Sequence, residues 1–190
     1  MIEYINRRRK TYYLHEGKTK TGKPKYFFSM KTEGTLVDSI PDGYEIYENP
    51  NAQVFLRKIP VQIVFPEEIE TVKFWLQKYL KPSYFILDVK GKNIIVYLCD
   101  QNVDNLMEIM TFPNVPDFFR KRDSLDFGLT YSPMMQFVLD DIESRSFTVE
   151  RWCFRGSIDD WIPLDSSTDL KKLVQTYGAH LGKDSFFDLM

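Results

Sequence analysis

Residues 84–99 read Tyr-Phe-Ile-Leu-Asp-Val-Lys-Gly-Lys-Asn-Ile-Ile-Val-Tyr-Leu-Cys, and this stretch decides the fold class. Two runs rich in aromatic and β-branched residues, 84–89 and 94–99, flank a short polar connection that contains Gly91. Runs of this composition form strands, and a short connection with glycine and asparagine between them is typical of a hairpin. Because the strands of a hairpin pair antiparallel, residues 84–99 predict an antiparallel sheet.

Helical patterns lie on both sides of this hairpin. Before it, Pro66 suits the first position of a helix, and Pro82 ends the run. The apolar residues between these prolines recur at helical spacing, at Ile69, Val72, Leu76, Tyr79 and Leu80. After the hairpin, helices are predicted over 103–110, with Asp100 or Asn102 as the cap, and over 169–181. Strands are predicted over 134–139 and 147–154, and residues 111–132 receive no assignment.

The first sixty residues predict two further hairpins. One pairs 11–16 with 25–31 across a long connection, and the other pairs 44–48 with 53–59. The sequence therefore predicts an α+β fold, in which antiparallel hairpins form a small N-terminal sheet and about three helices pack on a second antiparallel sheet. It also predicts two parts, a basic, aromatic-rich hairpin subdomain over 1–60 and an α+β domain over 61–190 that ends in an amphipathic helix.

Charge is distributed unevenly along the chain. Nine basic and two acidic residues precede residue 32, a net charge of +7, whereas the remainder carries −9. Such asymmetry predicts that nucleic acid or another polyanion binds the N-terminal hairpin. The predicted contact residues are basic side chains and tyrosines that could stack on bases: Arg7, Arg8, Arg9, Lys10, Tyr13, Lys18, Lys20, Lys23, Lys25 and Tyr26. The alternative is that these lysines only solvate a strand edge and prevent aggregation.

Strand alternation limits which rings can share a face of the first hairpin. Neighbouring residues of a strand point to opposite faces, so Phe27 and Phe28 cannot both be buried in one core. One of them is expected in the core, and the other requires an explanation. The nearby Gly17-Lys18-Thr19 is not a phosphate-binding loop, because Tyr12 stands where that motif has its other glycine.

Asp88-Val89-Lys90 is similar to the acid-x-Lys half of the metal-dependent nucleases with a PD-(D/E)xK signature. The resemblance implies that Asp88 holds a magnesium ion while Lys90 positions the attacking water. It also implies a second acid on an adjacent strand, for which Asp42, Glu45 and Glu48 are candidates. The second strand and the flanking helix depart from that family's pattern, and Lys90-Gly91-Lys92-Asn93 is also an ordinary turn.

Two acidic clusters and three arginines lie close together in the C-terminal part. The acids could bind a divalent cation, or they could pair with the arginines, which is the favoured interpretation. The residues concerned are Asp140, Asp141, Glu143, Asp159, Asp160, Arg145, Arg151 and Arg155.

Cys99 and Cys153 each lie in an apolar run, which indicates buried thiols rather than a disulfide. With His15 and His180 they show no zinc spacing, so no metal and no cofactor is predicted. No apolar segment follows the basic residues near the N-terminus, and no apolar run approaches the roughly 20 residues of a membrane span. The predicted location is cytoplasmic, without membrane association.

Three functions follow from the sequence, in order of preference. The first is a non-catalytic binding module for nucleic acid or another polyanion. The second is a protein-interaction or scaffold subunit, in which the basic and acidic parts of the chain serve assembly. The third is a divalent-metal-dependent, nuclease-like hydrolase built on Asp88 and Lys90.

Overall fold

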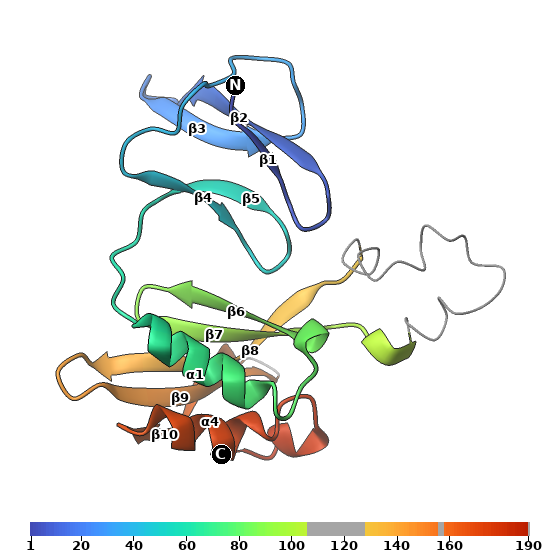
Figure 1. Ribbon diagram of the computed structural model, residues 1–190, viewed down its shortest axis with the longest axis vertical. Coiled ribbons are helices and arrows are strands. Elements are labelled where there is room, and N and C mark those ends of the chain that lie inside the picture. The colour runs from blue at the N-terminus through green and yellow to red at the C-terminus, as the bar shows by residue number, and fades with distance from the viewer. Residues whose placement is uncertain (106–127, 156–157, 190) are drawn as a thin grey trace. The chain divides into compact units, whose positions relative to one another are not determined.

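The computed structural model describes residues 1–105, 128–155 and 158–189 (Figure 1). The chain divides into two compact units. Among the described residues, the first unit comprises Met1–Ile59 with 104–105 and 128–129, and the second comprises the rest. The sequence-based division into a hairpin subdomain over 1–60 and an α+β domain over 61–190 stays a prediction.

Two small antiparallel sheets form the first unit (Figure 1). One has the order β1-β2-β3, with β1 at Glu3–Ile5, β2 at Thr11–Lys18 and β3 at Pro24–Ser29. The other pairs β4 at Tyr44–Glu48 with β5 at Val54–Lys58. Both predicted hairpins are therefore confirmed, but the expectation that they share one sheet is wrong.

The connection between β3 and β4 explains why the two hairpins lie in separate sheets. Residues 35–37 turn back to β2, where the Glu16 amide donates to the Thr35 carbonyl (2.9 Å) and the Val37 amide donates to the Leu14 carbonyl (3.0 Å). Gly34, with φ +114°, provides the turn that this return requires. The chain thus extends the pairing of β2 before it reaches β4, and β4 does not pair with β3.

The two faces of the β2–β3 hairpin differ as strand alternation predicts. Leu14 is fully buried and pairs with Phe28, so this face belongs to the core of the first unit. Phe27 pairs with His15 on the opposite face, and its side chain remains 41% exposed. The prediction that Phe27 and Phe28 have different environments is confirmed.

The second unit is built on a five-stranded antiparallel sheet with the order β10-β9-β8-β7-β6. Its strands are β6 at Phe85–Lys90, β7 at Asn93–Cys99, β8 at Tyr131–Asp141, β9 at Ser146–Arg155 and β10 at Ile158–Ser167. The predicted hairpin over 84–99 is confirmed as β6 and β7, and the α+β class is also confirmed. β10 was not predicted.

Two α-helices of the described residues accompany this sheet, α1 at Pro66–Leu76 and α4 at Leu170–Gly178. Short 3-10 helices cover Pro82–Tyr84 (η1) and Asp184–Phe186 (η3). The predicted helix over 103–110 is helical at 103–105, and its remainder lies outside the described residues, as do 111–127 of the unassigned stretch. None of the helices in the described part is long and apolar enough to cross a membrane.

Glu68 fixes the start of α1. Its carboxylate accepts a hydrogen bond from the Phe65 amide (2.7 Å), and Pro66 occupies the first turn, where no amide hydrogen is needed. The helix then buries Val72 and Leu76 against the sheet in one cluster with Leu173 and Val174 of α4. A Cβ atom added to Gly178 at the end of α4 would lie 2.8 Å from Leu76 Cδ2, so this glycine allows the two helices to approach closely.

Candidate polyanion-binding site

Four exposed lysines gather at the end of the β2–β3 hairpin. This group, here named the lysine loop, consists of Lys18 at the end of β2, Lys20 and Lys23 in the connection, and Lys25 near the start of β3. The connection is ordered by its own backbone, since the Thr19 amide donates to the Lys23 carbonyl (2.8 Å). The lysines are therefore presented by a defined turn of the chain.

No ion pair joins any lysine of this loop to an acid in the described part of the chain. Elsewhere basic side chains do have acidic neighbours, as Lys73 has Glu70 (3.4 Å) and Arg57 has Glu45 (2.8 Å). Four like charges without internal compensation create a local positive potential that attracts anions.

The arginines near the N-terminus have a different environment. Arg7 Nε lies 2.7 Å from Glu48 Oε1, and Arg7 Nη2 donates to the carbonyls of Asn49 (2.6 Å) and Pro50 (2.7 Å). Arg8 Nη2 donates to the Leu129 carbonyl. Both side chains contact the protein itself: Arg7 connects the β1–β2 turn to the β4–β5 turn, and Arg8 connects it to residue 129.

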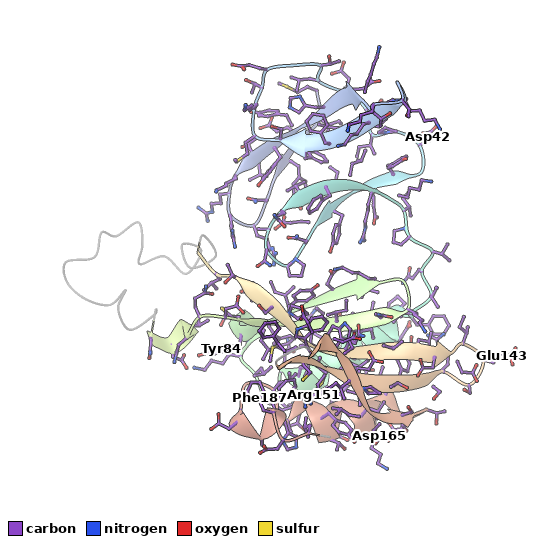
Figure 2. The ribbon with its side chains drawn as sticks, turned by 180° about the vertical axis from the view of Figure 1, so that it is seen from behind. Asp42, Tyr84, Glu143, Arg151, Asp165 and Phe187 are labelled. Carbon is purple, nitrogen blue, oxygen red and sulfur yellow. The ribbon has the colours of Figure 1, made fainter. Side chains whose placement is uncertain are left out.

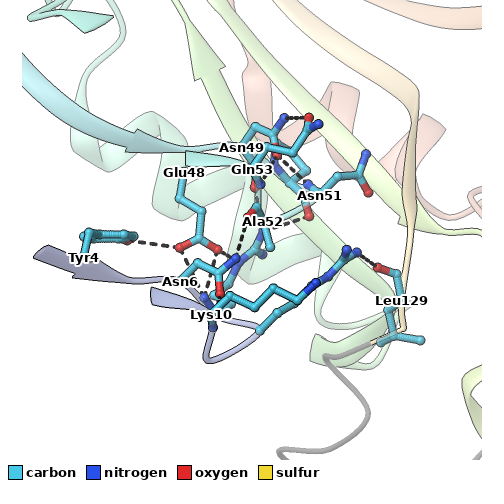
Figure 3. A network of polar contacts seen from close by, with 12 residues as sticks. Tyr4, Asn6, Lys10, Glu48, Asn49, Asn51, Ala52, Gln53 and Leu129 are labelled. Carbon is cyan, nitrogen blue, oxygen red and sulfur yellow. Dashed lines mark hydrogen bonds and ion pairs between the residues drawn. The ribbon is translucent and has the colours of Figure 1, made fainter. Parts of the chain in front are cut away.

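Asn6 and Glu48 complete this connection within the first unit. Asn6 Nδ2 donates to the Ala52 carbonyl (2.7 Å), and Asn6 Oδ1 accepts from the Lys10 amide (2.8 Å), as Figure 3 shows. Glu48 accepts a further hydrogen bond from the Tyr4 hydroxyl (3.0 Å). Burial raises the pKa of Tyr4, and the hydrogen bond to the Glu48 carboxylate and its negative charge raise it further.

The predicted basic residues therefore do not form one patch. Arg7, Arg8, Arg9 and Lys10 precede β2, whereas the lysine loop begins at the last residue of β2. The eight residues of β2 span about 23 Å, and this distance separates the two groups of basic residues. Of the predicted basic residues, only the four lysines of the loop lie at that end of the hairpin.

The predicted tyrosines do not share a face either. Tyr13 lies on the face that carries His15, whereas Tyr26 pairs with Glu16 on the face that carries Leu14, and both tyrosines are half-buried. The aromatic ring exposed beside the lysine loop is that of Phe27, which sequence reasoning did not assign to the site. A signal was present, because a glycine within a strand, here Gly17, often marks the close approach of another group.

Asp88 and Lys90 lie on the same face of β6, an edge strand of the five-stranded sheet. Their Oδ2 and Nζ atoms are 3.4 Å apart, and Lys90 Nζ donates to the Tyr97 hydroxyl (3.1 Å). Burial lowers the pKa of Lys90, but the Tyr97 hydroxyl and the Asp88 carboxylate together outweigh burial and raise it. Lys90 is thus held as a cation.

A second acid does not face Asp88 from the neighbouring strand. Ile95 of β7 pairs with Asp88, and Asn93 pairs with Lys90. Two of the candidate acids, Glu45 and Glu48, pair with arginines in the first unit. Among the residues that the structure describes, no group of three or more His, Cys, Asp or Glu side chains could hold a metal ion.

The favoured pairing of the C-terminal acids with Arg145 and Arg151 is wrong for the described residues, because both arginines contact partners distant in sequence and Asp140 pairs with Lys92. Arg145 Nε donates to Glu68 Oε1 (2.9 Å), and Arg151 Nε donates to the Leu189 carbonyl (2.7 Å). Arg151 is buried, and Figure 2 shows Glu143 at the β8–β9 turn. Asp141 accepts from the Glu143 amide (2.9 Å) and so stabilises that turn. The Arg155 side chain lies outside the described part.

Both cysteines are free, as predicted, and Cys153 is buried. Cys99 is half-buried, and this burial raises the pKa of its thiol; a hydrogen bond with Gln101 acts in the opposite direction, and the negative charge of Asp100 adds to the increase. A thiol of this kind is a weak nucleophile at neutral pH.

Comparison with known proteins gives no family, relative or structural neighbour. No protein-family model, no curated protein and no solved structure matches this chain. The candidate site therefore depends on its own geometry and charge.

Proposed function

We propose that the chain is a non-catalytic, cytoplasmic binding module that engages nucleic acid or another polyanion through the lysine loop. One observation carries the proposal: four exposed lysines lie within eight residues at a hairpin end, without an acidic partner in the described structure. The arginines are left out of the proposed contact surface, because Arg7 and Arg8 already bind carbonyl and carboxylate groups of the first unit.

The expected energetics are those of counterion release. A protein that neutralises Z phosphates of duplex DNA loses affinity with salt at a slope of roughly −0.9Z on logarithmic axes. Four lysines therefore predict a slope of about −3 to −4. Lysines bind as point charges, so this contact does not by itself select a sequence or a geometry.

Fluorescence anisotropy with labelled oligonucleotides and a labelled heparin fragment, between about 50 and about 200 mM salt, tests the proposal. Replacing Lys18, Lys20, Lys23 and Lys25 together with glutamine should abolish binding at low salt and flatten the salt dependence. The matched control replaces four exposed lysines of the second unit, Lys78, Lys92, Lys172 and Lys183, which changes net charge equally. Equal loss in both variants would show that only net charge matters, and absence of binding by the unaltered protein would refute the proposal.

A second candidate function is that of a protein-interaction subunit. It is favoured by a difference between β10 and β6, the two edge strands of the five-stranded sheet. β10 carries Asp159, Asp160, Pro163 and a shifted register, features that keep an edge strand from pairing with other chains. β6 has no proline and, within the described residues, pairs only with β7.

A depression of about 320 Å³ beside β6 adds to this contrast. Side chains of α1 and β6 line it, including Ile69, Phe85 and Leu87. An extended segment of another chain could add to β6 and place an apolar side chain there. Sedimentation velocity tests the self-assembly form of this idea: a self-associating protein should become monomeric on Ile86→Lys, a change on the face of β6 opposite the core-packed Leu87 and Val89. A monomer at every concentration contradicts self-assembly.

A further inference from the structure

Phe27 forms a flat, exposed ring beside the lysine loop. It lies on β3 directly opposite His15, and the two rings stack with their centroids 5.4 Å apart and their planes 12° from parallel. The Phe27 ring also extends over Gly17, where an added Cβ atom would lie 3.3 Å from Phe27 Cε1. Glycine at position 17 thus leaves the space in which this ring lies across β2.

His15 is a fixed support for that ring. It is 4% exposed, its Nε2 atom lies 2.9 Å from the Lys31 carbonyl oxygen, and its backbone bridges to Leu36. Gly34 covers its other edge, since an added Cβ atom there would lie 3.4 Å from His15 Nδ1. Because the support is buried and bonded, the orientation of Phe27 is set before any ligand arrives, and a ligand that stacks on it need not order it.

Lys25 and Phe27 lie on the same face of β3, two residues apart. Alternate residues of a strand are separated by about 7 Å, which is close to the distance between successive phosphates of an extended single strand. A lysine and a stacking ring at this spacing can contact a phosphate and the neighbouring base of one strand. In a duplex both faces of an internal base are covered by its neighbours, so the ring has nothing to stack on.

We infer that the polyanion is a single-stranded nucleic acid, one unpaired base of which stacks on Phe27 while the lysine loop binds the flanking phosphates. This inference rests on the proposed function and narrows it to one ligand class. Every base has an aromatic face, so recognition should depend little on sequence. DNA and RNA share the required chemistry, and the two are separate arms of the test.

The test compares Phe27→Leu with the unaltered protein on four labelled probes: a thymidine oligomer, a uridine oligomer, a duplex of equal length and a heparin fragment. Leucine keeps apolar contact with His15 but lacks an aromatic face. Phe27→Leu should weaken binding to the single strands about fivefold to about hundredfold and leave the duplex, heparin and the salt slope unchanged. Phe27→Tyr, which retains the ring, should restore single-strand binding.

The matched control is Phe55→Leu, because Phe55 of β5 is 45% exposed and stacks on Tyr47 rather than beside the lysine loop. The inference is overturned if Phe55→Leu weakens single-strand binding as much as Phe27→Leu does. It is also overturned if Phe27→Leu does not weaken single-strand binding in a protein that binds all four probes. Either result leaves the proposed function standing. Binding to none of the probes overturns the proposed function itself. Thermal unfolding of each variant, read by circular dichroism, separates a lost stacking contact from a lost fold.

Discussion

Glu48 and Arg7 meet with Oε1 and Nε 2.7 Å apart, and the Glu48 side chain is only 9% exposed. The same carboxylate accepts hydrogen bonds from the Tyr4 hydroxyl and the Arg7 amide. A nearly buried carboxylate with several donors stabilises the chain mainly because removing it leaves those donors unsatisfied.

Glu48→Ala should therefore lower the free energy of unfolding by about 2 kcal/mol, measured by urea denaturation. The control is Glu45→Ala on the same strand, whose carboxylate pairs with Arg57 at the surface, where such pairs contribute about 0–1 kcal/mol. Similar losses in the two variants would show that Glu48 is no more important than a surface acid.

Tyr4 gives a prediction about alkaline pH. Its raised pKa means that the folded protein keeps the phenol proton at a pH where the unfolded chain releases it. This contribution to stability is complete below the ordinary pKa of 10.0 and is lost as pH rises through the folded value. The difference in unfolding free energy between the unaltered protein and Tyr4→Phe should thus shrink above that pH. A difference that stays constant would contradict the assignment.

Cys99 should react slowly with iodoacetamide. Its raised pKa leaves little thiolate at neutral pH, so the pH at half-maximal rate should exceed the ordinary 9.0. Mass spectrometry of the Cys153→Ala variant isolates this single thiol. The same variant unfolded in urea provides the reference, and an equal rate in the folded state would show that the fold does not protect Cys99.

Gly178 sets the distance between α1 and α4. Gly178→Val should lower the free energy of unfolding by about 1–3 kcal/mol, because the added atoms meet the buried Leu76 side chain. Thr176→Val, an exposed position of the same helix, should change it by no more than about 0.5 kcal/mol. Thermal denaturation compares the two, and a tolerated valine at position 178 would mean that the helices can separate without cost.

Sequence periodicity predicted most of the strands, and the exceptions have physical reasons. β10 contains Asp159, Asp160 and Pro163, which are rare in strands, and it forms only because an edge strand needs few amide donors on its outer side. β1 has three residues, too few for a pattern to emerge. The prediction of a single N-terminal sheet was wrong because residues 35–37 pair with β2, and no local sequence pattern reveals this long-range pairing.

The candidate site was predictable only in part, for the same reason. Loop length and alternation place the lysines at one hairpin end, which local sequence is enough to show. The role of Arg7 depends on Glu48, 41 residues away, and the exposure of Phe27 depends on how His15 is buried. The local sequence gives no indication of the contact between Arg7 and Glu48. The only local indication of the contact between Phe27 and His15 is Gly17, an unusual residue within a strand.

Strand β2 keeps the β1–β2 turn, which carries Arg7, apart from the lysine loop, and this separation has an evolutionary consequence. Substitutions at one end can alter which ligand is held, and how tightly, without disturbing the cross-links at the other end. Homologues should accordingly drift in lysine number and loop length near residues 18–25 while Asn6, Arg7 and Glu48 vary together or not at all. Such uncoupling would let a lineage change its target without first acquiring a compensating stabilising mutation.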